Sequence, residues 1–303
     1  MTWNRREFVT VSSLGLVGAL GSRSLFAQAP AAQQPPTVPM FMDVRNNVGV
    51  FTARGGTIGY LVTPDAVIVV DSQFADTAPM FLDGMKSRTS RKIDLLINSH
   101  HHPDHTGGNK VMQPSVAQIV AHANVPGLQK KQAEGAKTEA NQAYATTTFE
   151  KDWKMSVGKE TVTARHYGPA HTSGDIAIVF QRANVVHMGD LMSFQRNPRA
   201  DRPAGASVRN WITVLENATK DHNNDTVYIF GHSKVGERVT GSRKDLLGLR
   251  DYLTAMVDYV NKSIAAGKSQ EETVKIAAIK GFESYEGTPV ALEAAYQELS
   301  GKS

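Results

Sequence analysis

Four histidines and one aspartate lie within six residues, directly after a short apolar run. The run is Ile93–Ile97, and the cluster follows as Ser99-His100-His101-His102-Pro103-Asp104-His105. A β-strand that ends in such a segment presents its polar side chains at one edge of a sheet, where they can converge. Imidazole and carboxylate groups suit a borderline divalent cation such as zinc. Because the 303-residue chain has no cysteine, His, Asp or Glu must hold any metal.

Three later segments place a metal-type residue beside glycine near the end of an apolar run. These residues are His171, Asp190 and His232, in the segments Gly168-Pro-Ala-His171, Met188-Gly-Asp190 and Phe230-Gly-His232. One histidine-rich motif cannot fill two metal shells, so ligands from other strand ends are needed. The repeated placement predicts that one edge of the structure gathers these side chains.

Short β-branched runs alternate with amphipathic stretches along the rest of the chain. The spacing of apolar residues between Leu246 and Ile264 predicts a long helix, begun by a capping box at Ser242 and Asp245 and ended at Gly267. We expect two mixed sheets with helices outside. The predicted strands are 48–53, 57–62, 66–70, 93–97, 118–121, several within 146–165, 176–180, 185–188 and 226–230, and the other helices are 75–86, part of 128–142, and 208–219.

These motifs resemble those of the metallo-β-lactamase-fold hydrolase superfamily, in particular its glyoxalase II-like and lactonase-like branch. Over residues 45–235, the signature His-x-His-x-Asp-His and the three later ligand positions are all met, by His100, His102, Asp104, His105, His171, Asp190 and His232. The resemblance implies an α/β fold, a four-layer αβ/βα sandwich. We expect a single domain over residues 40–303 with a helical C-terminal part.

The resemblance also implies which residues hold two Zn²⁺ ions, with iron or manganese as alternative metals. The first ion takes His100, His102 and His171, the second takes Asp104, His105 and His232, and Asp190 bridges them. Asp104 is the expected catalytic residue, which orients a hydroxide and relays a proton. Asp71, at the end of Val67-Ile-Val-Val-Asp71, either supports a metal-bound histidine or forms a turn. We expect the remaining histidines to be surface or core residues without a ligand role: His101, His122, His166, His187 and His222.

Such a site implies a metal-dependent hydrolase. Two adjacent cations lower the pKa of a shared water, and the resulting hydroxide can cleave an ester, thioester or lactone-type bond in a small molecule. One alternative is a periplasmic metallo-β-lactamase, although β-lactamases of this fold place Cys at the position of Asp190 or lack a ligand there. Two further alternatives are an iron-dependent redox enzyme and a non-enzymatic metal-binding protein.

No residue is assigned to the substrate from the sequence. Four polar residues follow Asp190 closely, and they either form a solvated loop, the interpretation we favour, or bind an anionic group: Ser193, Arg196, Arg199 and Arg202. The sequence also leaves the substrate, the native metal and the oligomeric state open.

The N-terminal residues resemble a twin-arginine export signal. Arg5-Arg6 precedes the apolar stretch Val9 to Leu20, and small residues extend to Ala29. We expect a signal peptide over residues 1–29, whose cleavage site is not fixed by the sequence, and a Pro-rich linker over residues 30–39. The mature protein is then periplasmic or secreted, in a bacterium, after transient contact with the twin-arginine machinery and without stable membrane insertion.

The net charge argues against a nucleic-acid partner. The whole chain carries +4, and residues 1–29 contribute +2 of it. The remaining 30 basic and 28 acidic residues form no long basic run. A surface that binds nucleic acid has a much larger basic excess, so we expect a small-molecule substrate instead.

Overall fold

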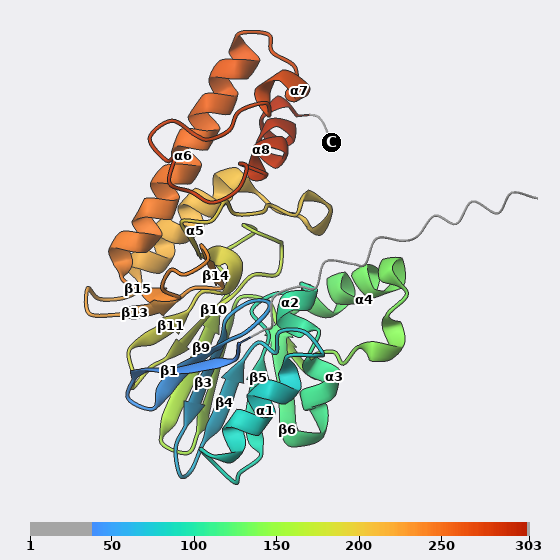
Figure 1. Ribbon diagram of the computed structural model, residues 1–303, viewed down its shortest axis with the longest axis vertical. Helices are drawn as coiled ribbons and strands as arrows, with labels where there is room; N and C mark the ends of the chain where they lie inside the picture. Colours follow the sequence, from blue (N-terminus) through green and yellow to red (C-terminus); the bar gives the residue numbers. More distant parts are fainter. Residues whose placement is uncertain (1–37, 302–303) are drawn as a thin grey trace, which may run out of the picture. The chain divides into compact units, whose positions relative to one another are not determined.

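The computed structural model of the protein describes residues 38–301 (Figure 1). The predicted signal peptide and all but the last two residues of the predicted linker lie outside these described residues. Thr37–Ser303 forms one compact unit, which is the part considered below. Among the described residues, no helix combines the length and the apolar character needed to cross a membrane.

The first sheet has seven strands in sequence order, and its far half is parallel. Strands β1 to β4 form an antiparallel meander, and β4 to β7 run parallel to one another. The strands are β1 (Met40–Arg45), β2 (Val48–Thr52), β3 (Ile58–Val62), β4 (Val67–Val70), β5 (Ile93–Ile97), β6 (Val116–His122) and β7 (Thr147–Phe149).

The second sheet has six strands in the order β15-β13-β11-β10-β9-β8. All neighbouring strands in it are antiparallel except β11 and β13, which run parallel. The strands are β8 (Asp152–Val157), β9 (Glu160–Arg165), β10 (Ala177–Phe180), β11 (Val185–His187), β13 (Val227–Ile229) and β15 (Thr240–Gly241). A separate two-stranded parallel ribbon joins β12 (Ser193–Phe194) to β14 (His232–Ser233).

The two sheets pack face to face through alternate residues of their strands. Ile68 and Val70 of β4 point inward and contact a buried cluster that includes Ile178 of β10 and Ile229 of β13. Val67 and Val69 lie on the opposite face with helix α1 (Ala78–Lys86). Because side chains alternate across a strand, β4 is apolar on both faces and therefore lies between two layers.

Helices cover the outer face of the second sheet. Trp211 of α5 (Val208–Lys220) is fully buried against residues of β10, β11 and β13, together with residues of α6 (Arg243–Ala265) and α8 (Ala291–Ser300). The order helix, sheet, sheet, helix is the predicted four-layer α/β sandwich, which is confirmed. Shorter elements are α2 (Pro103–Thr106), α3 (Asn109–Met112), α4 (Val125–Ala136), α7 (Gln270–Thr273), η1 (Gln113–Ser115), η2 (Glu139–Asn141), η3 (Gly189–Leu191) and η4 (Arg202–Ala204).

The structure differs from the sequence prediction in several places, and the short strands β12, β14 and β15 are among the elements not predicted. Strand β1 was not predicted, yet it pairs with β2 across the turn Asn46-Asn47, whose two residues have φ of 47° and 66° and so suit a tight hairpin. Helix α1 begins at Ala78 rather than at residue 75. Residues 75–77 form a turn instead, in which the Thr77 N–H donates to the Phe74 carbonyl. Most of residues 274–290 is not helical, although the C-terminal part was predicted to be so. The capping box at Ser242 and Asp245 is confirmed.

Candidate metal centre

The seven side chains predicted as metal ligands lie together at one sheet edge. They arrive from the end of β5 and helix α2, from the segment before β10, from η3 after β11, and from β14. They form two groups within which one ligand atom per residue lies no more than 4.8 Å from the others. Group one contains His100, His102, His171 and Asp190, and group two contains Asp104, His105 and His232.

Group one brings three imidazole nitrogens to one point. His102 Nδ1 lies 3.1 Å from His100 Nε2 and 2.9 Å from His171 Nε2. All three rings are almost entirely buried. The three buried nitrogens face one another instead of each facing a separate hydrogen-bond partner. A cation with nitrogen ligands requires this arrangement.

Group two combines imidazole with carboxylate. His105 Nε2 lies 3.3 Å from His232 Nε2, and His232 Nε2 lies 3.0 Å from Asp104 Oδ2. The Asp104 side chain is 26% exposed, whereas that of His105 is fully buried. Group two is therefore the more acidic group and the one that reaches solvent.

Asp190 faces both groups with different oxygens. Its Oδ1 lies 3.0 Å from His105 Nε2 and 3.4 Å from His232 Nε2, in group two. Its Oδ2 lies 3.4 Å from His171 Nε2, in group one. Although Oδ1 is buried, none of these approaches gives it a hydrogen bond with proper geometry among the described residues. An unpaired buried oxygen between converging nitrogens fits a site built for cations.

Glycines allow the backbone to approach these ligands closely. A Cβ on Gly231 would lie 2.3 Å from Asp190 Oδ1, and a Cβ on Gly56 would lie 2.2 Å from the His105 ring. Gly189, directly before Asp190, has φ of 50°, which favours glycine. Side chains at these positions would displace the ligands.

The opposite nitrogen of each ring lies within hydrogen-bond distance of a protein group, which can accept a hydrogen bond in four of the rings and is a donor at His232. A metal-binding histidine uses one nitrogen for the ion and is oriented through the other. The partners are Ser99 Oγ for His100 Nδ1 (3.1 Å), Asp201 Oδ2 for His102 Nε2 (2.8 Å), Asp71 Oδ2 for His105 Nδ1 (2.7 Å), Arg199 O for His171 Nδ1 (2.6 Å) and Arg196 for His232 Nδ1 (3.0 Å). The five free nitrogens all point into the centre.

Asp71 fulfils both of its sequence interpretations. It has φ of 66°, so it does turn the chain after β4. It also accepts hydrogen bonds from the Ser99 backbone N–H and hydroxyl, each at 2.7 Å, and from His105. Both of its oxygens are therefore occupied, and the turn and the ring orientation depend on one carboxylate.

Sequence reasoning missed Asp201 and the Arg199 carbonyl, which orient His102 and His171. Asp201 lies on an irregular loop, eleven residues after Asp190, and no apolar run or motif marks it. It could also form a third possible metal group with His101 and His102. His101 Nε2 is 3.9 Å from Asp201 Oδ2, so these two do not make a hydrogen bond.

Charge and burial affect the two groups differently. Burial lowers the pKa of His100, and lowers that of His171 to about 4, so these two rings of group one are neutral. Burial also opposes the charge of His105, but the carboxylates of Asp190, Asp71 and Asp104 outweigh it and raise its pKa. In group two the metal-free centre therefore balances imidazolium against carboxylate.

The carboxylates of this centre are ionised. Burial raises the pKa of Asp104 and Asp190, but His105 and His232 lower both well below the usual range. For His232, burial is outweighed by Asp190 and Asp104, which raise its pKa to about 9. The Arg196 guanidinium opposes this protonation, because it can only donate to Nδ1 and a protonated ring offers no acceptor there.

The remaining histidines lie outside the two groups. His122, His166 and His187 each contact a backbone carbonyl oxygen, of Glu150, Asp175 and Thr57 respectively. His222 packs near Tyr228, with ring centroids 6.2 Å apart. None of these four belongs to a possible metal group among the described residues.

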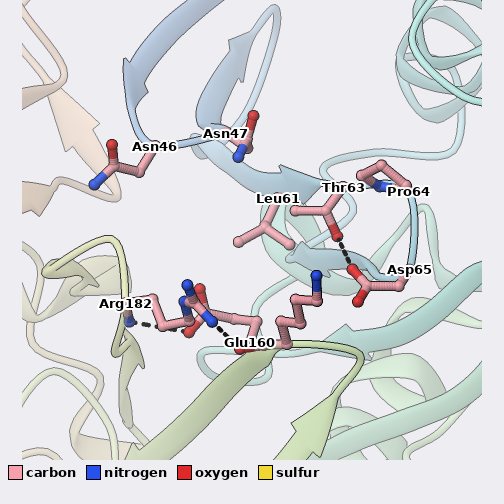
Figure 2. A pocket seen from close by; sticks show the side chains of 9 residues that line it. Asn46, Asn47, Leu61, Thr63, Pro64, Asp65, Glu160 and Arg182 are labelled. Atoms are coloured by element: carbon pink, nitrogen blue, oxygen red, sulfur yellow. Dashed lines mark hydrogen bonds between the residues drawn. The ribbon is translucent and has the colours of Figure 1, made fainter.

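A cavity of about 740 Å³ lies elsewhere, lined by the turns that connect neighbouring strands (Figure 2). Its carboxylates already have partners: Asp65 accepts from the Thr63 hydroxyl at 2.9 Å, and Glu160 accepts from the Arg182 backbone N–H at 3.0 Å. No histidine lines it. Its size exceeds that of the cavity beside the metal centre, but its lining offers no converging ligand atoms.

Comparison with known proteins identifies the family. The model of the metallo-beta-lactamase superfamily matches residues 52–232, which include all seven clustered side chains. The chain belongs to this superfamily. One similar protein is named a probable metallo-hydrolase. The protein is a metal-dependent hydrolase with candidate metal-binding clusters of His and Asp.

Two relatives cover much of the chain. The chain is 24% identical over 260 residues to a metallo-beta-lactamase type 2 of Elizabethkingia meningoseptica, covering 83% of this chain and 96% of that one. It is 25% identical over 193 residues to a probable metallo-hydrolase of Methanocaldococcus jannaschii, covering 60% and 90%.

Solved structures share the fold. A stereoselective inverting sec-alkylsulfatase from a Pseudomonas species has a TM-score of 0.66 at 15% identity. That match covers 86% of this chain, which spans about half the length of the sulfatase. A metallo-beta-lactamase from Pontibacter korlensis has a TM-score of 0.59 at 15% identity, covering 72% of this chain and 99% of that one.

Proposed function

We propose that the protein is a dinuclear zinc hydrolase that cleaves an ester, thioester or lactone-type bond in a small molecule. The observation that carries this proposal is the carboxylate of Asp190, whose two oxygens face two separate ligand groups. Zinc suits the nitrogen-rich donor set, with iron or manganese as the alternatives. Two cations bound there would supply a hydroxide nucleophile near neutral pH and polarise the carbonyl oxygen.

Asp104 is the residue placed to handle the proton. It is the most exposed carboxylate of the centre, at 26%, and its Oδ2 contacts His232 Nε2 at 3.0 Å. From there it can orient a water molecule at the solvent side and accept its proton. Asp71, Asp201 and the Arg199 carbonyl keep the histidine rings in one orientation while this happens.

A β-lactamase activity is the second candidate. The similarity to a metallo-beta-lactamase type 2 over 83% of the chain favours it. Against it stands Asp190 at the position where β-lactamases of this fold place Cys or lack a ligand, and the chain contains no Cys. We therefore rank the ester, thioester and lactone class first.

We also propose that the protein works in the periplasm or outside a bacterial cell, without nucleic acid or stable membrane insertion. The support is the pair Arg5-Arg6 before an apolar stretch and the small charge of the remaining chain. Replacing both arginines by lysine should leave the protein in the cytoplasmic fraction of an expressing bacterium. Unchanged export would contradict this localisation.

The function is tested by metal analysis and a substrate panel. The purified protein should contain two zinc ions per chain and hydrolyse one class among esters, thioesters, lactones, β-lactams, phosphodiesters and sulfate esters. Asp190→Ala should abolish turnover, whereas Asp258→Ala, on the exposed face of α6, should not change it. Turnover of β-lactams alone would favour the second candidate. Metal-independent turnover would exclude both.

A further inference from the structure

A groove opens beside group two of the metal centre. The cavity has a volume of about 590 Å³ and is lined by strands β1 and β2, the turn at Gly55, Arg196 and the segment from Gly231 to Thr240. His232 belongs both to the lining and to group two. A molecule in this groove therefore lies next to the reacting end of the site.

The groove has apolar walls that face solvent. Met40 and Met42 line one side and Val235 and Val239 the other. Met40 is 50% exposed and Val235 is 84% exposed, and they are two of only five large hydrophobic side chains exposed among residues 38–301. Exposed apolar side chains that gather around a concave surface are typical of a ligand site.

Two cations in the groove have no carboxylate partner within residues 38–301: Arg196 and Lys234. Arg238 differs, because it pairs with Asp245 at 2.7 Å and lies over the Phe194 ring at 4.2 Å. The groove also contains Asp43 and Glu237. The hydrogen bond to Asp245 raises the pKa of Arg238 and the negative charge of Glu237 adds to this, so the Glu237 carboxylate acts on a cation that is already paired. Of these charges, the unpaired Arg196 guanidinium lies 3.0 Å from His232 Nδ1, directly beside group two of the metal centre.

The Arg196 guanidinium needs a hydrogen-bond acceptor. His232 cannot provide one when its ring binds a metal ion. Its guanidinium lies 3.0 Å from His232 Nδ1 and can only donate. A neutral ring that gives Nε2 to a cation carries its hydrogen on Nδ1, so two donors would then face each other. The exposed Arg196 guanidinium is then available to an anion in the groove.

The C-terminal segment holds both walls in place. Glu286 pairs with Arg196 as an isolated parallel bridge, donates its backbone N–H to Gln195 O at 2.8 Å and accepts from the Asn197 N–H at 3.1 Å. Its side chain accepts from the Val235 N–H at 3.3 Å. We call Tyr285–Gly287 the C-terminal clamp. It fixes the loop that bears Arg196 and the loop that bears Val235.

We propose that this groove selects an anionic amphiphile as the substrate, with a negative group held by Arg196 and an apolar chain lying along Met40, Met42 and Val235. This inference rests on the proposed hydrolase function. A guanidinium beside His232 and exposed apolar side chains in the same lining match one molecule that has both a negative group and an apolar chain.

The experiment compares two esters of equal length on the zinc-loaded protein, one with a free carboxylate and one in which it is methylated. The wild type should prefer the anionic ester, and Arg196→Ala should lower kcat/KM for it by about tenfold to hundredfold, the range for one charged hydrogen bond. Turnover of the methylated ester should stay unchanged. Arg196→Lys should restore part of the preference, and Arg209→Ala, on the exposed side of α5, is the matched control.

Chain length tests the apolar wall. Each methylene added to the anionic ester should raise kcat/KM by up to about fourfold while it is buried in the groove. Val235→Asp should remove this gain. If Val235→Asp changes the oligomeric state and leaves the chain-length dependence intact, the groove is a contact between copies and the proposal is wrong.

The outcomes separate this inference from the function. If both esters are hydrolysed equally, or Arg196→Ala slows both equally, the hydrolase function holds and the anionic preference is refuted. If neither these esters nor any ester, thioester or lactone of the panel is hydrolysed, the proposed function fails, and calorimetric binding of decanoate decides the groove. Binding that Arg196→Ala weakens at least tenfold supports an anion site, and binding that it leaves unchanged refutes one.

Discussion

Group one and group two lie on either side of the same Asp190 carboxylate but are built differently. Group one surrounds its centre with three buried imidazoles, and burial keeps those of His100 and His171 neutral. Group two combines two imidazoles with two carboxylates if Asp190 is counted, and Asp104 reaches solvent. The supports also differ, because the loop 199–201 orients His102 and His171 of group one, whereas Asp71 at the end of β4 orients His105.

The two groups therefore suit different tasks. Group one suits the binding of a cation, and group two suits the reaction with water. A closed set of neutral nitrogens binds a cation without admitting solvent, and an acidic, partly exposed set can exchange protons with water. Group two also borders the groove through His232. We therefore expect damage to group one to appear mainly as lost metal, and damage to group two as lost metal together with altered proton transfer.

Asp190→Ala should have the largest effect because it removes one oxygen ligand from each group. We expect hydrolysis to fall to the uncatalysed background and both metal ions to be bound more weakly. Plasma emission spectroscopy after gel filtration measures the metal content. Retention of two ions with full activity would show that the two groups do not depend on the shared carboxylate.

His102→Ala should affect group one alone. The substitution deletes the ring whose Nδ1 lies within 3.1 Å of both other imidazoles of that group. We expect one ion per chain to be lost, with the ion in group two retained and hydrolysis abolished. If both ions are lost together, the groups are filled as a unit and the distinction between them fails.

Asp71→Asn and Asp201→Asn compare the supports of the two groups. Both oxygens of Asp71 accept hydrogen bonds, so an amide must turn a donor toward Ser99 or His105 and favours the wrong tautomer of the ring. Asp201 uses Oδ2 alone for His102, and an amide oxygen can replace it.

Metal affinity should fall by about 100-fold for Asp71→Asn and by about tenfold for Asp201→Asn, the range for such supporting residues. Competition with a fluorescent chelator measures both values, and Asp258→Asn serves as the control. Equal losses of metal affinity in the two variants would mean that the number of carboxylate oxygens accepting hydrogen bonds does not determine the loss.

The smallest effect concerns Asp175, beneath group one. Burial raises its pKa to about 7, and it accepts from the Thr172 backbone N–H (2.7 Å) and hydroxyl (2.6 Å), next to His171. Because the folded pKa lies above the unfolded one, its stabilising contribution is complete below about pH 4 and is lost as the pH rises through 7.

Asp175→Asn should remove this part of the pH dependence. Thermal unfolding of the metal-free protein between pH 4 and 8 should show a flatter decline in the variant than in the wild type. An identical slope in both proteins would place the titrating group elsewhere.

The sequence predicted the strands that carry ligands because each is a short apolar run interrupted sharply by glycine and a metal-type residue. Ile93–Ile97 and the capped helix after Ser242 are examples in which local chemistry agrees with the final fold. The seven clustered side chains could likewise be predicted from the sequence, since each lies near the end of an apolar run.

The rest depended on long-range pairing. Met40–Arg45 has no strong pattern of its own and becomes a strand because β2 offers it an edge. Asp201 reaches His102 from 99 residues away along the chain, on a loop without periodicity. Arg196 was interpreted as a solvated residue, and the pairing of β12 with β14 together with the bridge to Glu286 brings it against His232.

The C-terminal clamp lies outside the stretch of sequence that defines the family, residues 52–232. The clustered metal-type residues and the clamp that holds the groove loops are thus encoded in different parts of the chain. Mutations in Tyr285–Gly287 can alter the choice of substrate without touching a ligand, so selectivity can evolve while the reaction itself is conserved.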